Sequence, residues 1–258
     1  MKAPSFAYAK PRSLTEALDL LDRPGAKILA GGQSLIPSLN MRLSSPELLV
    51  DITGLKGLAN IEVRDGVVRI GALCTHTRVE RSPEVREQLP LLAEAVAHVA
   101  HPAIRNRGTL GGSLALADPN AELPACALAL DAVLIVAGRK GERRVPAAGF
   151  FKALFETDLG PDEILVGAEF PKAAKSVFLE LARRQGDYAI VGLAATSRGA
   201  EKRIAFFGVA ATPILLKPKS LEEAIKALPT PNADLYNTSA TKRHLAGVLL
   251  ERAWNNLS

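Results

Sequence analysis

The chain has 258 residues, of which 48% are hydrophobic, 23% charged and 5% aromatic, and its formal net charge is +5. This composition is that of a globular protein long enough for one large domain or two modest ones, and it excludes a disordered chain. The few aromatic residues offer no platform for stacking bases, and the densest basic run, residues 138–144, is typical of a solvated turn, so we expect no nucleic acid partner.

The first part of the chain predicts short apolar strands between capped helices. Ser13 followed three residues later by Glu16 has the pattern of a capping box and starts a helix. Asp65-Gly66 at the centre of an alternating stretch indicates a β-hairpin. We expect strands at residues 26–30 and 47–53 and the hairpin at 61–73.

The next part is richer in helix. Ser82 followed by Pro83 predicts the start of a helix, which Pro90 divides into two pieces. We expect these helices within residues 81–100, a short buried helix at 121–130, a hairpin around Gly141 and a strand at 163–171.

The pattern changes near residues 171–176. Three strand candidates follow, joined by polar turns that contain glycine, and they predict an antiparallel meander. Two amphipathic helices complete the chain. We therefore expect an α+β protein with a first domain at 1–172, divided into lobes of about 1–54 and 55–172. The second domain, 173–258, should hold a three-stranded antiparallel sheet and helices.

Two glycine-rich stretches carry the chemistry, residues 28–40 with Gly31-Gly32 and residues 101–124 with three further glycines. Glycine permits positive φ and close approach of a ligand, and successive N–H groups in such a loop bind anions. A helix beginning at Leu35 would direct its N-terminus at the same point, and Ser34 offers a hydroxyl. A diphosphate suits this site, whereas a plain turn is the alternative reading of Gly31-Gly32 taken alone.

The second stretch surrounds its glycines with polar side chains. Neither stretch matches the G-x-G-x-x-G fingerprint or a P-loop, so the sequence supports neither a Rossmann domain nor an NTPase. Asp118 and Glu122 could accept hydrogen bonds from ribose hydroxyls. Alternatively, Asp118 is a helix N-cap followed by Pro119 at the first helical position.

The remaining reactive side chains indicate no chemistry of their own. Cys74 and Cys126 are expected to be buried free thiols, too few to hold an iron–sulfur cluster or a four-cysteine zinc site. His98 and His101 are expected to be hydrogen-bonded structural residues. We predict no metal site and no catalytic residue. With no apolar run of roughly 18 residues and no leader-like segment, the expected location is the cytoplasm and no membrane span is expected.

Five segments, in the expected order, resemble the FAD-binding medium subunit of the molybdenum hydroxylases, the family of carbon monoxide dehydrogenase and bacterial xanthine dehydrogenase. They are AGGQSLIPSLNMRL, IGALCTHTRVERSP, IRNRGTLGGSLALADPNAELP, LGPDEILVGAEFP and RRQGDYAIVGLAA. A likeness at 239–253 extends the resemblance over essentially the whole chain. It implies the two-lobed FAD-binding module of the vanillyl-alcohol-oxidase/PCMH type, followed by a small α+β domain of the carbon monoxide dehydrogenase flavoprotein type.

The resemblance also implies a set of FAD-binding residues. The first loop would wrap the diphosphate with Ala30, Gly31, Gly32, Gln33, Ser34 and Leu35. The second would contribute Ile104, Thr109, Gly111, Gly112, Ser113 and Leu116, with Asp118 or Glu122 on the ribose. Ile164 and Leu165 would lie on the adenine side, Tyr188 near the isoalloxazine ring, and Thr75 and His76 near the flavin. From the residues alone, Tyr188 is equally well explained as a core tyrosine anchored by its hydroxyl.

The sequence departs from the family pattern in three places. Ser113 stands where many members carry asparagine, which removes an amide from the cofactor site. The turn at 196–203 is short. No inserted loop with four cysteines is present, which disfavours the branch that reduces aromatic thioesters.

The function implied is an oxidoreductase subunit. Electrons from a molybdenum-cofactor large subunit would pass through two 2Fe–2S clusters of a small subunit to this FAD, and then to NAD⁺, a quinone, oxygen or another acceptor. The complex would be a heterotrimer, dimerised. Two alternatives stay open, a stand-alone FAD-dependent oxidoreductase and a flavin-free paralogue that serves in docking or assembly.

Overall fold

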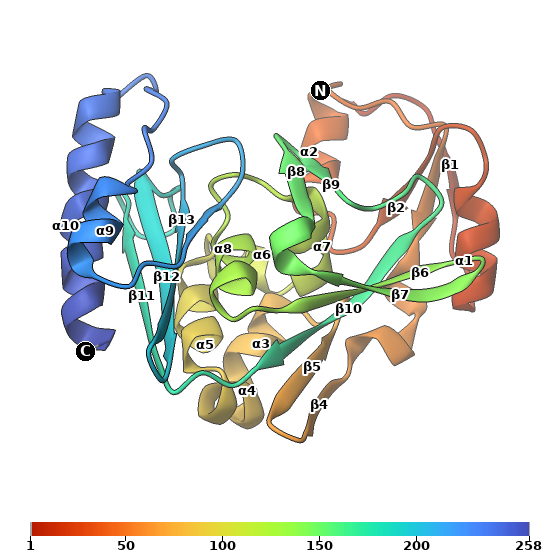
Figure 1. Cartoon of the computed structure of the whole chain (residues 1–258). Coiled ribbons are helices and arrows are strands. Elements are labelled where there is room, and N and C mark those ends of the chain that lie inside the picture. The colour runs from red at the N-terminus through yellow and green to blue at the C-terminus, as the bar shows by residue number, and fades with distance from the viewer. Residues whose placement is uncertain (1, 258) are drawn as a thin grey trace.

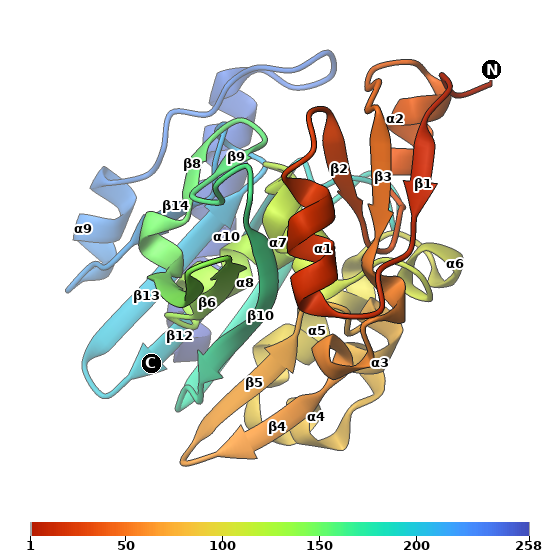
Figure 2. The ribbon, with the colours of Figure 1, turned by 90° about the vertical axis from the view of Figure 1, so that its right-hand side faces the viewer.

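The computed structural model describes residues 2–257 and places the first three strands in a small parallel sheet (Figure 1). Its order is β1 (Ala7–Ala9), β3 (Leu48–Asp51), β2 (Ala26–Leu29). Helix α1 (Leu14–Leu21) lies against this sheet, in front of it in Figure 2. The predicted cap is present, because Ser13 Oγ accepts from Glu16 N at 3.1 Å. Helix α2 (Leu35–Asn40) follows β2.

A five-stranded antiparallel sheet forms the centre of the molecule. Its order is β4 (Ile61–Arg64), β5 (Val67–Gly71), β10 (Ile164–Pro171), β6 (Val133–Gly138), β7 (Gly141–Pro146). Both predicted hairpins are confirmed. At the first, Asp65 and Gly66 adopt φ of 50° and 75°, the left-handed pair that a two-residue hairpin turn requires.

Short helices and one small hairpin connect these strands. The helices are α3 (His76–Arg81), α4 (Pro83–Gln88), α5 (Pro90–His98), α6 (Pro102–Arg105), α7 (Leu110–Leu116) and α8 (Glu122–Ala129). Ser82 Oγ accepts from Val85 N at 3.2 Å and Pro90 begins α5, as the sequence predicts. Three turns of 3-10 helix (Ile52–Gly54, Lys56–Ala59 and Ala147–Gly149) and the hairpin β8 (Phe151–Ala153) with β9 (Glu156–Thr157) complete this part.

The C-terminal sheet has four strands where the sequence predicted three. The expected meander is present as β11 (Lys175–Leu181), β12 (Val191–Arg198) and β13 (Glu201–Phe207). A short β14 (Ile214–Leu216) then pairs with β13. Three residues are too few to show an alternating pattern, so the strand exists only because β13 offers it a free edge.

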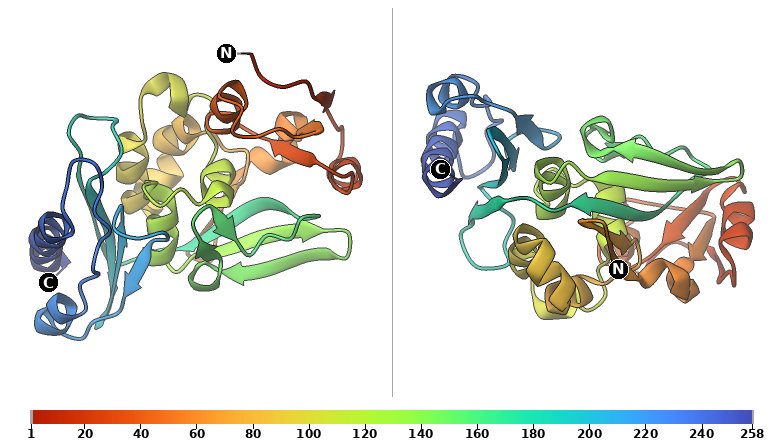
Figure 3. Two further views of the ribbon diagram at one scale, coloured as in Figure 1. Left: turned by 90° about the horizontal axis from the view of Figure 1, so that it is seen from above. Right: turned by 60° about the horizontal axis from the view of Figure 1, so that its bottom comes forward.

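Helices cover both faces of the C-terminal sheet (Figure 3). Helix α10 (Ser239–Leu257) packs on the outer face near α9 (Leu221–Lys226), and α5 and α8 pack on the inner face. The inner core therefore joins Phe178 and Phe207 of this sheet to residues of α5 and α8. The domain division at residue 172 stays a prediction. Within residues 2–257 no helix is both long and apolar enough to cross a membrane.

Candidate cofactor site

The first glycine loop leaves the carboxyl end of β2, next to the carboxyl end of its parallel neighbour β3. The register pairs Leu29 with Asp51, which brings the two strand ends to one edge. A cavity of about 330 Å³ opens there, lined by residues 29–33, 36 and 37 together with Asp51, Thr53 and Arg107. Ligands of parallel sheets bind at this edge because loops diverge there.

The loop presents unused hydrogen-bond donors. The backbone N–H groups of residues 31–35 donate to no residue in the described part of the chain. Ser34, the N-cap of α2, makes no side-chain capping bond, so its hydroxyl is also available. Gly32 has φ of +73°, which turns the loop back on itself. Five free amides beside the N-terminus of α2 form a concave donor set suited to diphosphate oxygens.

The two glycine loops touch through their backbones. A Cβ at Gly31 would lie 2.3 Å from the carbonyl oxygen of Arg107 and 2.8 Å from Cα of Gly108. Both distances are shorter than any real Cβ contact, so only glycine allows this approach. The structure thus brings together two segments that lie about 75 residues apart in the sequence.

Most backbone donors of the second loop are already bonded, to the loop itself or to residues 72 and 74. The N–H groups of Gly108, Leu110, Gly111 and Gly112 donate to Ile104 O, Cys74 O, Ala72 O and Thr109 Oγ1 at 2.7, 2.9, 2.9 and 3.0 Å. Gly111 is a packing glycine, because a Cβ there would lie 2.4 Å from Cβ of Ala72. What remains for a ligand is the N–H group and hydroxyl hydrogen of Thr109 and the hydroxyl of Ser113.

Thr75 and His76 lie behind this second loop. Thr75 forms an isolated antiparallel bridge with Thr109, and His76 N donates to Gly108 O at 2.9 Å. The His76 side chain is 5% exposed, and burial lowers its pKa to about 4. Neither ring nitrogen makes a hydrogen bond of full geometry with the residues described, although the backbone of Thr109 lies near enough to oppose part of the pKa shift. The buried, neutral imidazole therefore packs behind the second loop rather than facing the cavity.

Asp118 does not cap a helix, so that alternative is wrong. Ala117 adopts φ of 52°, the chain then turns, and Asp118 Oδ1 accepts from Asn120 N at 2.9 Å within this turn. Helix α8 begins only at Glu122, with Ala121 as its N-cap. Glu122 is half-buried. Burial, and then the charges of Glu180 and Asp118, raise the pKa of its carboxyl to about 8.

Tyr188 is 71% exposed, so the alternative of a core tyrosine is wrong. Its segment is held by Gly186, whose φ is +84° and where a Cβ would lie 2.7 Å from Ala100 O. Desolvation of the hydroxyl end and the adjacent Asp118 carboxylate, through its charge and a hydrogen bond, raise the pKa of Tyr188. The ring is therefore free to be covered, next to the predicted ribose acid.

The side chains of Ile164 and Leu165, predicted to lie on the adenine side, are buried in the protein. Their side chains are 2% and 5% exposed and belong to two different hydrophobic cores. Strand β5 pairs with β10 only from Gly167 onward, which leaves the backbone edge at 164–165 unpaired on that side. The buried side chains are therefore closed to a ligand. Two further candidates, Ile104 and Leu116, are half-buried beside the second loop.

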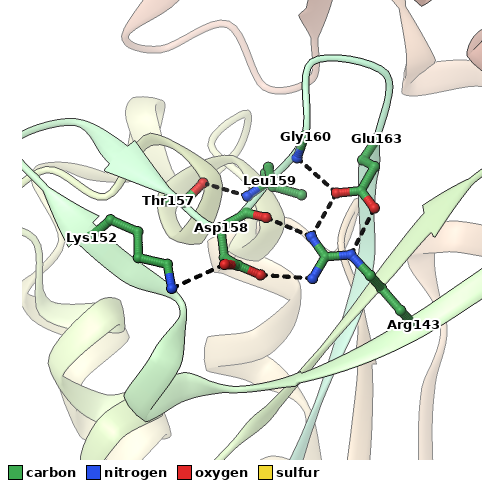
Figure 4. A network of polar contacts seen from close by, with 7 residues as sticks. All are labelled: Arg143, Lys152, Thr157, Asp158, Leu159, Gly160 and Glu163. Atoms are coloured by element: carbon green, nitrogen blue, oxygen red, sulfur yellow. Dashed lines mark hydrogen bonds and ion pairs between the residues drawn. The ribbon is translucent and has the colours of Figure 1, made fainter.

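An ionic network holds the segment that leads into β10 (Figure 4). Arg143 of β7 donates to both oxygens of Glu163 at 2.7 and 2.6 Å and to a carboxylate oxygen of Asp158 at 2.7 Å. Lys152 Nζ adds an ion pair to Asp158 at 3.0 Å. Gly160 N donates to Glu163 Oε2 at 2.7 Å. The guanidinium fixes both ends of residues 158–163, and with them the entry into Ile164.

The structure adds three residues that the sequence did not single out. Arg107 lines the cavity, is exposed, and forms no ion pair with any residue from 2 to 257. Its only sequence signal is its place directly before Gly108. Asp51 and Thr53 also line the cavity. Thr53 N and Oγ1 donate to Asp51 at 2.9 and 2.6 Å, and Tyr8 also donates to it. Burial raises the pKa of Asp51, but these bonds outweigh it and lower the pKa overall.

A comparison with known proteins agrees with this geometry. The family model described as "FAD binding domain in molybdopterin dehydrogenase" matches residues 4–173. The chain belongs to this family. Its cofactor is accordingly FAD, and the chain is a flavoprotein medium subunit of an oxidoreductase of the molybdenum hydroxylase family. No group of three or more His, Cys, Asp or Glu among residues 2–257 is arranged to hold a metal ion.

Individual relatives extend the likeness to the whole chain. The alpha subunit of the 6-hydroxypseudooxynicotine dehydrogenase complex of Paenarthrobacter nicotinovorans is 48% identical over 75% of this chain and 67% of its own length. The carbon monoxide dehydrogenase medium chain of Hydrogenophaga pseudoflava is 36% identical over 99% and 98%. Quinoline 2-oxidoreductase from Pseudomonas putida 86 contains a chain of the same fold, with a TM-score of 0.92, 37% identity and coverage of 100% and 98%. The fold predicted from the sequence is thereby confirmed.

Proposed function

We propose that this chain carries electrons within a complex, from the 2Fe–2S clusters of a small subunit to an external acceptor. A large subunit with a molybdenum cofactor would oxidise the substrate, and the assembly would be a dimerised heterotrimer. The names of the relatives support this proposal, since they are called medium chains or subunits of dehydrogenases. The two buried free thiols fit a reducing compartment, and we place the complex in the cytoplasm.

The free amides of the first loop carry the assignment of the FAD diphosphate to residues 30–35. Five donors that no described residue uses lie beside a cavity, together with an unpaired guanidinium at Arg107. Charge-assisted hydrogen bonds of this kind are stronger than neutral ones. Thr109 and Ser113 would add hydroxyl donors from the second loop.

The remaining candidates define the other parts of FAD. Asp118 or Glu122 would hold the ribose, the backbone at Ile164 and Leu165 would meet the adenine, and the exposed face of Tyr188 would lie against the isoalloxazine ring. The flavin supplies the redox chemistry, storing two electrons that arrive one at a time. The protein's residues bind and orient it, and leave one edge reachable for the acceptor.

Gly31→Ala tests this assignment. Its Cβ would push the second loop away from the first, so we expect the Kd for FAD to rise at least about tenfold, from about 1–3 kcal/mol of overpacking. Gly57→Ala is the matched control, because nothing lies within 4 Å of a Cβ there. Flavin fluorescence quenching during titration gives both constants. Equal FAD affinity in the two variants would refute the placement of the diphosphate.

The partner assignment has a separate test. Chain purified from its native host should carry a subunit with molybdenum and a subunit with four iron atoms in two 2Fe–2S clusters, detected by metal analysis and electron paramagnetic resonance. Turnover of a small substrate by the isolated chain would instead favour a stand-alone oxidoreductase. Absence of FAD uptake would favour a flavin-free docking paralogue.

A further inference from the structure

A buried lysine on the outer helix α10 reaches to the end of strand β13. Lys242 is 6% exposed. Its ammonium group donates to the carbonyl oxygen of Gly208 at 3.0 Å and pairs with a carboxylate oxygen of Asp234 at 2.9 Å. Removing an ammonium group from water costs free energy, which an apolar side chain of similar length would not require. What the two partners do therefore explains the lysine better than the stability of the core does.

Gly208, the first residue after β13, connects this lysine to the inner part of the protein. Its N–H group donates to Pro119 O at 2.9 Å, while its carbonyl oxygen accepts from Lys242. Its φ is +76°, and a Cβ there would lie 3.2 Å from Ala189 O. Only glycine adopts this conformation without strain while another backbone passes so close. Gly208 therefore joins the outer helix to the turn at Pro119 and to the backbone next to Tyr188.

The turn that Gly208 holds carries a predicted ribose acid. Pro119 directly follows Asp118, whose Oδ1 atom accepts from Asn120 N at 2.9 Å. The carbonyl oxygen of Asp118 accepts from Ala121 N at 3.0 Å. These two bonds make residues 118–121 one compact unit. The bond from Gly208 N to Pro119 O ties this unit to the C-terminal sheet, so a shift of Gly208 moves the backbone that carries the Asp118 carboxylate.

The second partner of the ammonium group fixes it from the outside. Asp234 Oδ1 accepts from the backbone N–H groups of Tyr236 and Asn237, both at 2.8 Å, so its own loop holds the carboxylate. The hydrogen bond from Lys242, and then these amides, keep the pKa of Asp234 well below its ordinary value. The carboxylate therefore stays charged, and a charge-assisted bond on one side with a carbonyl group on the other gives the ammonium group one position.

We propose that Lys242 is a positioning residue for FAD, because it fixes Gly208 and Gly208 fixes the turn that places Asp118 for the ribose. The proposal rests on the proposed function, in which Asp118 or Glu122 holds the ribose, and it assigns that role to Asp118. Lys242 acts through two successive hydrogen bonds and not by contact with the cofactor. The C-terminal domain thereby takes part in binding FAD from its outer helix.

The link from Lys242 to the turn can be tested in the FAD-free chain. Lys242→Met keeps an apolar stem and removes the ammonium group, and NMR follows hydrogen exchange of the Gly208 amide. We expect this amide to exchange at least about tenfold faster in the variant. Arg243→Met is the matched control, because Arg243, the next residue of α10, also donates to carbonyl groups, Leu228 O at 2.7 Å and Pro229 O at 3.0 Å. An unchanged rate in Lys242→Met, or the same acceleration in Arg243→Met, would overturn the proposal.

The link to the cofactor needs FAD titrations of four proteins, the wild type, Lys242→Met, Asp118→Asn and the double variant. We expect Lys242→Met to raise the Kd for FAD at least about fivefold in the wild-type background and to leave it unchanged in the Asp118→Asn background, because both changes act on one contact. A general loss of stability would instead weaken binding by the same factor in both backgrounds. Equal factors, or wild-type affinity in Lys242→Met, would overturn the proposal.

Asp234→Asn keeps the test open if Lys242→Met does not fold. It removes the charge partner of the ammonium group at a side chain that is 38% exposed. We expect the Kd for FAD to rise about two- to threefold, and again only where Asp118 is present. Wild-type affinity in this variant would also overturn the proposal. A chain that binds no FAD would refute the proposed function, while the exchange rate of the Gly208 amide would still decide what Lys242 holds.

Discussion

The two glycine loops look alike in sequence and differ in what their backbones do. From Gly31 to Leu35 no N–H group donates to a described residue, whereas from Gly108 to Gly112 all but that of Thr109 do. The first loop is held from outside, by its contact with Arg107 and Gly108, and so keeps its donors free. The second is held by hydrogen bonds to its own residues and to Ala72 and Cys74, and it supports the first. A glycine count alone does not separate a binding loop from a supporting one.

Gly111→Ala should give the largest effect and sharpens the supporting role. The added Cβ would meet Ala72 at 2.4 Å in a fully packed place, so we expect the free energy of unfolding to fall by about 3 kcal/mol in the FAD-free chain. Chemical denaturation measures it, with Gly57→Ala as the control. A fall in the free energy of unfolding no larger than that of Gly57→Ala would show that the second loop shifts to accommodate the added Cβ.

Acid should destabilise the fold through His76, which packs behind the second loop. His76 has a folded pKa of about 4 against 6.5 when exposed, so the unfolded chain binds more protons between these values. The stabilisation is complete above pH 6.5 and is lost as the pH falls toward 4, by about 2–3 kcal/mol. Urea unfolding at several pH values measures this.

His76→Gln isolates that contribution. Glu122 and Glu180, whose pKa values are raised, act in the opposite direction, so that stability falls as the pH rises from about 4.5 to 8. Both carboxyls are present in the two proteins, so their contribution cancels when the free energy of unfolding of the variant is subtracted from that of the wild type. Parallel pH curves for the two proteins would contradict the assignment to His76.

Gly32→Ala and Gly66→Ala separate binding from backbone strain. Both glycines have left-handed φ, +73° and +75°, so both variants should lose about 1 kcal/mol of stability. Only Gly32 contributes a free amide to the cavity, and its Cβ would also crowd Ile36 at 3.1 Å. We expect a roughly tenfold weaker FAD affinity for Gly32→Ala alone. Equal affinities would mean that this turn lies outside the binding site.

The smallest effects should come from two hydroxyls. Thr109 caps α7 by accepting from Gly112 N, so Thr109→Val should cost about 1 kcal/mol of stability. Ser34 caps nothing, so Ser34→Ala should leave the melting temperature unchanged and weaken FAD binding a few-fold. Thermal unfolding and FAD titration of both variants check the contrast. A lower melting temperature for Ser34→Ala would contradict it.

Local signals in the sequence predicted much of the fold. Ser13, Ser82 and Asp65-Gly66 each act on residues within four positions, and each produces the expected cap or turn. The glycine pair and the helix start at Leu35 were likewise visible. Strand β14 was not, because its three residues depend on the free edge of β13, which only the folded sheet provides.

The parts of the site that the sequence missed depend on long-range contacts. The role of Arg107 follows from its approach to Gly31, and the raised pKa of Glu122 depends in part on the charge of Glu180, 58 positions away in the chain. The cap alternative for Asp118 failed because the left-handed Ala117 starts a turn before the helix. Whether an amide is free or used cannot be read from residue types, since it depends on which carbonyl groups the fold brings near.

The central sheet has one further consequence, for how the chain unfolds. Neighbouring residues of β6 and β10 point to opposite faces, so that Leu134 and Ala168 enter one hydrophobic core while Ile135 and Ile164 enter the other. Both strands contribute side chains to both cores, so unfolding of either strand removes packing from both cores at once. We therefore expect the two hydrophobic cores to melt in a single cooperative transition, without a half-folded species.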